Sequence, residues 1–164
     1  PACDTCTKNQ FLLPFEKFSS LTDTLEVESD ESEIVDKDNY LITGNVVLRS
    51  ETHFLSADKV VVSTTEKTSQ SSGNVKYQDH NFFLIADQLD VQKENDELII
   101  NVEKISYQEI TSKANGIAEN IFKTSNYAIL NESSYSMCPI NDNTWYIKAK
   151  KINFNLFKYF KQLL

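Results

Sequence analysis

Three cysteines are the most reactive side chains of this 164-residue chain. Cys3 and Cys6 form a Cys-x-x-Cys pair at the start, and Cys138 follows far downstream. Such a pair is typical of a redox couple or of half a zinc site. A redox pair of the thioredoxin type opens a helix after a buried strand, and zinc needs a second pair of ligands. Neither context surrounds these residues, so we expect no metal. An odd cysteine count in a secreted β-domain indicates either a partner thiol elsewhere or a reduced cysteine.

The other residues that could do chemistry recur with a repeat. His53 and His80 occupy equivalent polar turns, so we expect exposed loop residues rather than metal ligands. Asp58 and Asp87 could be read as the paired carboxylates of a glycosidase. Catalytic acids are singular, however, whereas structural positions recur, so we predict that both aspartates form hydrogen bonds at a bend. Because nucleophile-elbow, phosphate-loop and His–Ser or His–Cys motifs are all missing from the sequence, we predict neither an enzyme nor a bound cofactor.

Composition narrows the classes of partner. The formal net charge is −8 and the pI is about 4.8, which argues against a nucleic-acid partner because phosphate backbones need a basic surface. The longest apolar runs, such as Phe82–Ala86, are too short to span a bilayer as a helix. The chain opens without a basic and apolar leader, although a processed secreted segment would look the same.

An internal repeat positions these residues. Residues 43–62 and 72–91 align 29 positions apart with eight of 20 residues identical, as Gly-Asn-Val followed by Phe-Leu-x-Ala-Asp. Fainter copies of the Ala-Asp step occur at Ser29-Asp30, at Ala118-Glu119 and at Ala149-Lys150. A period near 30 residues predicts stacked supersecondary units that cannot bury an apolar face alone.

Each repeat predicts two strands joined by a short polar turn. Val46 and Leu48 share one face by the period of two. In the following strand Leu55 shares a face with the alanine of the Ala-Asp step, whereas Val60 and Val62 fall on the other face. A bulge or bend at the Ala-Asp step would restore a continuous apolar lining, so we predict that each long strand is folded there.

The rest of the chain continues in the same style. Strand-like stretches and turn signals alternate, and Asn95-Asp96 and Asn115-Gly116 are the clearest turn signals. Helical periodicity is confined to Phe11–Leu21, where it is ambiguous, and to Phe157–Leu164. The acidic residues 22–38 are predicted to form a solvated lead-in. The fold class is therefore all-β, with bent antiparallel strands that form either a filled sandwich or an open sheet with an apolar trough.

Parts of the sequence resemble a known protein family. The Gly-Asn-Val and Ala-Asp repeat resembles the periplasmic OstA-type domain of lipopolysaccharide (LPS) transport proteins. The stretch Tyr135-Ser136-Met137-Cys138-Pro139, followed by Trp145 and a final Ala-x-x-Ile strand, resembles the end of the N-terminal domain of the LPS-assembly (LptD/OstA) family. The likeness covers residues 25–154 as a β-jellyroll. It implies a cysteine-bearing segment at residues 1–24 and a tail toward a missing barrel at residues 155–164.

The resemblance also implies a location and partners. Such a domain lies in the periplasm, attached to an outer-membrane β-barrel with its plug lipoprotein. It receives LPS from a periplasmic bridge protein by edge-strand addition and passes the lipid A acyl chains to the barrel. Cys138, and either Cys3 or Cys6, are implied to form disulfides with barrel cysteines. Two alternatives remain open: a bridging or membrane-anchored relative of the same system, and a structural or adhesive β-solenoid.

The expected lipid-binding residues of the trough are apolar side chains of the predicted strands. They are Val46, Leu48, Leu55, Val60, Val62, Val75, Tyr77, Leu84, Leu89, Val91, Ile99, Ile105, Ile121, Ile129, Ile147 and Ile152.

Overall fold

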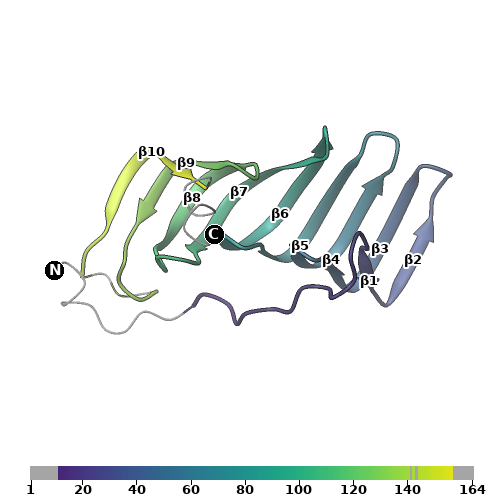
Figure 1. Cartoon of the computed structure of the whole chain (residues 1–164), viewed down its shortest axis with the longest axis horizontal. Helices are drawn as coiled ribbons and strands as arrows, with labels where there is room; N and C mark the ends of the chain where they lie inside the picture. The colour runs from purple at the N-terminus through teal and green to yellow at the C-terminus, as the bar shows by residue number, and fades with distance from the viewer. Residues whose placement is uncertain (1–10, 141, 143, 157–164) are drawn as a thin grey trace.

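A single antiparallel sheet forms the molecule. The computed structural model describes residues 11–140, 142 and 144–156. Its strands lie in the order β1-β3-β4-β5-β6-β7-β8-β9-β10, and β2 pairs with β3 beside β1 (Figure 1). The described residues contain no helix, and so none that could cross a membrane. The prediction of an all-β fold is confirmed. The strands are β1 (Glu26–Glu28), β2 (Glu31–Ile34), β3 (Asn39–Arg49), β4 (Phe54–Ser63), β5 (Thr68–Gln78), β6 (Phe82–Glu94), β7 (Glu97–Glu109), β8 (Asn115–Lys123), β9 (Tyr127–Tyr135) and β10 (Ile147–Asn155).

The sequence repeat corresponds to a pair of neighbouring strands. The first copy covers most of β3 and β4, and the second covers most of β5 and β6. Asn95 and Asp96, with φ of 51° and 63°, form the predicted two-residue turn between β6 and β7. Each repeat therefore adds two strands to the same sheet.

The strands bend where the repeat predicts. On β5 the register shifts between Ser72 and Val75 with β6, and between Ser72 and Lys76 with β4. Both shifts span Gly73 and Asn74, whose φ values are +77° and +47°. Asn74 Nδ2 donates a hydrogen bond to Asp58 Oδ2 of β4 at 2.9 Å. A Cβ at Gly73 would lie 2.5 Å from the same oxygen, so the site requires glycine for space as well as for backbone conformation. The Gly-Asn step of one strand and the Ala-Asp step of the next make the bend together.

The same hydrogen bond from the bend asparagine to an aspartate occurs at a second bend, on β3, but not at the Ala-Asp step of β6. Asn45 Nδ2 donates to Asp30 Oδ2 at 2.9 Å, beside Gly44. The expectation for Asp87 is wrong, because this exposed carboxylate has no hydrogen-bond partner among the described residues. The facing part of β7 holds no Gly-Asn pair, and Lys104 takes the positive φ there instead, at 51°.

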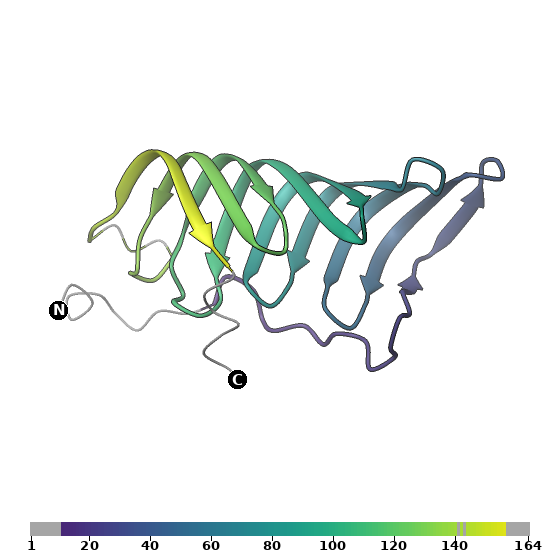
Figure 2. The ribbon, with the colours of Figure 1, turned by 45° about the horizontal axis from the view of Figure 1, so that its top comes forward.

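The bend divides the sheet into two arms that face each other. We name them arm 1 and arm 2, and Figure 2 shows strands such as β8 to β10 curving from one into the other. Every ladder between long strands is interrupted at this level. Arm 1 contains residues 46–49, 54–57, 75–78, 82–86, 105–109, 115–118, 133–135 and 147–149. Arm 2 contains residues 39–43, 59–63, 68–72, 88–94, 97–103, 120–123, 127–131 and 151–155.

One local prediction is wrong, and a second is confirmed for exposure but did not include strands. Asn115 and Gly116 lie inside β8 rather than in a turn. A Cβ at Gly116 would lie 2.0 Å from the carbonyl oxygen of Ser134, so this glycine permits a close backbone approach. The acidic lead-in is exposed as expected, but it is ordered into β1 and β2, which pair with β3.

The ambiguous segment Phe11–Leu21 is extended. It runs along the free ends of the arm 1 strands (Figure 1). The Gln78 side chain accepts from the Glu16 amide at 2.9 Å and donates to the Glu16 carbonyl at 3.2 Å, as a neighbouring strand would. The rings of Phe11 and Phe15 pack edge-on against Phe83. The segment thus acts as a strap over the outer face of arm 1. Phe157–Leu164 lies outside the described residues.

The bend glycine gives a first test. We expect Gly73→Ala to lower the free energy of unfolding by about 2 kcal/mol or more, because alanine is strained at φ +77° and its Cβ meets Asp58. Urea denaturation measures the change. Ser72→Ala, one residue earlier and not at positive φ, is the control and should change stability little. Equal effects of the two substitutions would contradict this account of the bend.

Candidate lipid-binding interior

Apolar side chains from both arms fill the space between them. Of the predicted trough residues, nine belong to the buried core cluster, each 7% exposed or less: Val46, Leu55, Val60, Val75, Tyr77, Leu84, Leu89, Ile105 and Ile121. Four more are partly buried and pack against it: Leu48, Val62, Val91 and Ile152. The interior is therefore apolar from β3 to β10, and its central part is packed with side chains.

Three predicted residues lie elsewhere. Ile99 and Ile129 alternate with buried neighbours and so occupy the outer face, while Ile147 is 54% exposed at the start of β10. Ile100 and Leu130 take the inward positions, at 2% and 0% exposure. Further inward residues, which the sequence pattern did not predict, lie at the arm ends and near the bend: Ile42, Ala57, Phe82, Ala86, Val102, Tyr107, Ala118, Ala128, Phe154 and Leu156.

One ion pair joins the two arms inside the molecule. Asp79 follows the last residue of β5 in arm 1, whereas Lys123 ends β8 in arm 2. Lys123 Nζ lies 2.6 Å from Asp79 Oδ2, and the two side chains are only 4% and 5% exposed. Both residues lie at the free ends of their arms, away from the bend. We call this pair the clasp, because it holds the free ends together.

Both charged side chains of the clasp form further hydrogen bonds. Asp79 accepts from the Tyr77 hydroxyl at 2.9 Å and from the backbone amides of Asn81 and Phe82 at 2.7 and 2.8 Å. Lys123 Nζ also donates to the Thr124 carbonyl at 3.2 Å. Burial alone would raise the pKa of Asp79, but Lys123 and the two backbone donors outweigh it and hold that pKa below its ordinary value. Asp79 therefore stays ionised inside an apolar interior.

The same environment changes the protonation of its neighbours. Burial, followed by the charge of Asp79, raises the pKa of the Tyr77 hydroxyl far above its ordinary value, so that Tyr77 remains a donor. His53 is half-buried rather than exposed as predicted, and its ring centroid lies 5.9 Å from that of Tyr77. Burial lowers the pKa of His53, while Asp79 opposes this shift.

Aromatic rings make a second contact between the arms. Phe154 of arm 2 lies edge-on to Phe82 of arm 1, with ring centroids 5.3 Å apart, and 6.2 Å from Tyr107. Strands β5 to β7 of arm 1 are thus covered by strands β8 to β10 of arm 2, since the sheet twists as it folds. The contacts that close the interior come from the middle and C-terminal strands. The partly exposed inward side chains are Leu48, Val62 and Val91 on β3, β4 and β6, and Ile152 and Phe154 on β10.

Of the three cysteines, the structure describes only Cys138. Cys138 is fully buried and disulfide-bonded, and Asn115 Nδ2 donates to its carbonyl at 2.7 Å. Cys3 and Cys6 lie outside the described residues, so the predicted pairing stays a prediction. Among residues 11–140, 142 and 144–156, no cluster of three or more His, Cys, Asp or Glu side chains is placed to hold a metal ion.

Fold and interior together define a class of protein: an open-edged antiparallel sheet folded around an apolar interior. A solved structure with this fold is LptH, the LptA-homologous periplasmic component of the lipopolysaccharide transport device of Pseudomonas aeruginosa. It matches with a TM-score of 0.52 at 14% identity, over 60% of this chain and 74% of that one. The fold is thus the β-jellyroll that the sequence predicted.

Sequence comparison identifies the family. Residues 26–159 match the family described as LptA/(LptD N-terminal domain) LPS transport protein, and the chain belongs to this family. LPS-assembly protein LptD of Xanthomonas euvesicatoria pv. vesicatoria is 30% identical over 110 residues, which cover 67% of this chain and 13% of that protein. LptD of Xylella fastidiosa strain 9a5c is 27% identical over 113 residues, 69% of this chain and 14% of that protein. The chain therefore spans only a small part of these relatives.

The clasp can be tested by changing its charges. Lys123→Met leaves Asp79 buried without its partner, so we expect a loss of about 3–5 kcal/mol in the free energy of unfolding. Lys123→Met/Asp79→Asn removes both charges while the asparagine oxygen still accepts from Asn81 and Phe82, and it should recover most of the loss. Urea denaturation of the single and double variants measures the coupling. Equal stability of Lys123→Met and the original chain would contradict the clasp.

The pKa of Asp79 predicts a pH dependence. Its folded pKa is below the unfolded value of about 3.9, so its stabilising contribution is present above about pH 4 and is lost as the pH falls through the lowered pKa. The neutral double variant lacks this contribution. We therefore expect the stability of the original chain to fall more steeply below pH 4 than that of the double variant, in parallel urea titrations.

Proposed function

We propose that the chain is the periplasmic domain of an outer-membrane LPS translocon, and that acyl chains of lipid A travel between its two arms. The observation that carries the proposal is the apolar interior that continues from β3 to β10 in a transport-family fold. An acyl chain inside is protected from water, which is worth about 0.8 kcal/mol for each buried CH₂. The sugars remain outside in water.

The packed interior means that lipid entry requires the arms to separate. Besides the apolar packing of the core cluster, two specific contacts join the arms in the middle, the clasp and the Phe154 aromatic group. On β3 and β4, near the β1–β2 end, the inward side chains of Leu48 and Val62 are partly exposed, although Val46 and Val60 beside them are buried. Lipid would therefore enter at the β1–β2 end, and parting of the arms at the clasp would extend the channel toward β10.

The two ends of the sheet differ in charge. Residues 22–38, around β1 and β2, carry eight Asp or Glu and a single Lys, while β10 carries Lys148, Lys150 and Lys151 and no acid. The β1–β2 end also exposes Leu25, Val27, Ile34 and Val35, at 46–72%. An unpaired edge with exposed apolar side chains is suited to strand addition. Its acidity favours a partner whose docking strand is basic.

We assign this end to the periplasmic bridge protein, which would add its edge strand beside β1 and β2. The β10 end would then face the outer-membrane barrel and its plug lipoprotein. Cys138, with Cys3 or Cys6, would tie the domain to barrel cysteines, and because Cys138 is already disulfide-bonded here its bond to the barrel would form by thiol–disulfide exchange. The matches to LptD proteins support a role in LPS transport, because those proteins are named for LPS assembly.

Photo-crosslinking tests the acyl-chain path. A photoreactive amino acid at Leu55, Leu84 or Val91 should capture LPS in cells, because these side chains line the interior. Lys67 and Glu94 are exposed positions that should not capture it. Ile99 and Ile100 form a matched pair of identical side chains on opposite faces, and only Ile100 should react. Capture at Lys67, Glu94 and Ile99 alone would exclude an interior path.

Edge docking has its own test. Ile34→Asn removes a side chain that is 72% exposed on β2, and it should weaken binding of the LptA-type bridge protein about tenfold in a pull-down titration. Ile147→Asn, on the opposite end and 54% exposed, is the matched control and should bind normally. Loss of binding with Ile147→Asn alone would reverse the assignment of the two ends.

A further inference from the structure

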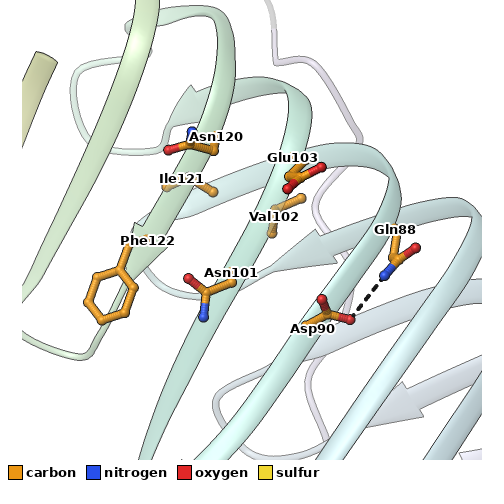
Figure 3. Close-up of a pocket in the computed structure, with 8 residues that line it drawn as sticks. All are labelled: Gln88, Asp90, Asn101, Val102, Glu103, Asn120, Ile121 and Phe122. Atoms are coloured by element: carbon orange, nitrogen blue, oxygen red, sulfur yellow. Dashed lines mark hydrogen bonds between the residues drawn. The ribbon is translucent and has the colours of Figure 1, made fainter. Parts of the chain in front are cut away.

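A polar cleft lies on the outer face of arm 2, away from the interior. It has a volume of about 330 Å³ and spans β6, β7 and β8. Val102 and Ile121 point into the core, so their alternating neighbours point outward into this cleft. Figure 3 shows these outward side chains on one face, with Asn101 between Asp90 and Phe122. The outward lining residues are Gln88, Asp90, Asn101, Glu103, Asn120 and Phe122.

Some of these polar groups are fixed by neighbours. Asp90 Oδ1 accepts hydrogen bonds from Gln70 Nε2 at 3.0 Å and from Gln88 Nε2 at 3.3 Å. Asn120 Oδ1 accepts from Asn131 Nδ2 at 2.7 Å. Each group is thereby oriented before any ligand arrives, and each retains free hydrogen-bonding capacity.

Other groups of the cleft are available to a ligand. The side chains of Asn101 and Glu103 make no hydrogen bond within the described part of the chain. The Asn101 amide can donate and accept, whereas the Glu103 carboxylate accepts. Together with Asp90 and Asn120 they surround the cleft with planar groups that match the hydroxyls of a sugar.

An aromatic ring completes the lining. Phe122 is half-buried, and its ring lies 6.0 Å from that of Tyr127 at an angle of 31°, which supports it from the side. A pyranose ring presents C–H groups on one face and hydroxyls around its rim. A flat ring beside amides and carboxylates therefore fits both parts of a sugar.

The charge of the cleft restricts the kind of sugar. Asp90 and Glu103 supply two carboxylates, and no Lys or Arg lines the cleft. A phosphate or sugar carboxylate would be repelled, whereas a neutral sugar can donate its hydroxyls to both carboxylates. We propose that this cleft binds neutral sugar units of LPS, on the outside of the sheet whose inside holds the acyl chains. The inference rests on the proposed function for its choice of glycolipid.

Sugar without lipid tests the cleft by itself. The probe is the oligosaccharide released from LPS by mild acid hydrolysis and then dephosphorylated, titrated into the isotope-labelled chain by NMR. We expect chemical-shift changes centred on residues 88–90, 101–103 and 120–122. Asn101→Ala, Glu103→Gln and Phe122→Ala should each weaken binding about tenfold. Gln92→Ala and Glu94→Gln, on exposed positions of β6 outside the cleft, are matched controls and should bind normally.

Three results would overturn the cleft as a sugar site. They are the absence of shifts with the free oligosaccharide, shifts confined to other faces, and binding that EDTA abolishes, which would indicate a divalent cation held by the carboxylates. The same spectra show whether each variant is folded. Because the probe carries no acyl chain, this experiment can fail while interior crosslinking succeeds, or the reverse.

Discussion

A lone antiparallel sheet with one apolar face has nothing to bury that face against, and the whole architecture follows from how this chain meets that constraint. The sheet folds across its own strands, so that one half covers the other. The bend is built from backbone that most residues avoid, with Gly73 and Asn74 at positive φ and Asp58 receiving the asparagine amide. Because the bend recurs at the same level in each ladder between long strands, the eight strands β3 to β10 form two arms with a shared interior.

The clasp has a different character from the packing around it. A buried ion pair is seldom better for stability than apolar side chains of the same size, since both charges lose their hydration. Lys123 and Asp79 nevertheless join the arms in the middle of an apolar interior. Their contact is directional, and it fixes which strand ends meet. It also can be exchanged for water when the arms part, whereas interlocked apolar packing gives no such alternative partner. A polar closure suits the proposed opening of the interior along its length.

The sequence revealed the bend where glycine marks it and missed it where glycine is absent. Gly-Asn and Ala-Asp steps made the change of face visible in β3 to β6. In β7 and β9 the residues at the equivalent bends are Lys104 and Glu132, at φ of 51° and 42°. Neither strand contains a Gly-Asn or Ala-Asp step that would predict the bend. A period of two carried across those bends places Ile99 and Ile129 inside, whereas the structure buries Ile100 and Leu130. The clasp could not be predicted from the sequence for another reason. Asp79 follows β5 and Lys123 ends β8, and only the twist of the folded sheet brings them together. Local sequence pattern carries no information about such a long-range contact.

Because successive side chains of a strand point to opposite sides, the folded sheet has an apolar inner face and a polar outer face. Inward positions such as Leu89, Val102 and Ile121 are apolar and dry, while their outward neighbours Asp90, Asn101 and Asn120 are polar and wet. LPS has the same division, with acyl chains that need a dry environment and sugars that need water or hydrogen-bonding groups. A folded sheet separates these environments by the thickness of one strand. In the proposed arrangement a large amphiphile is held without a closed cavity of its own size, because each part of it needs only the face that matches it.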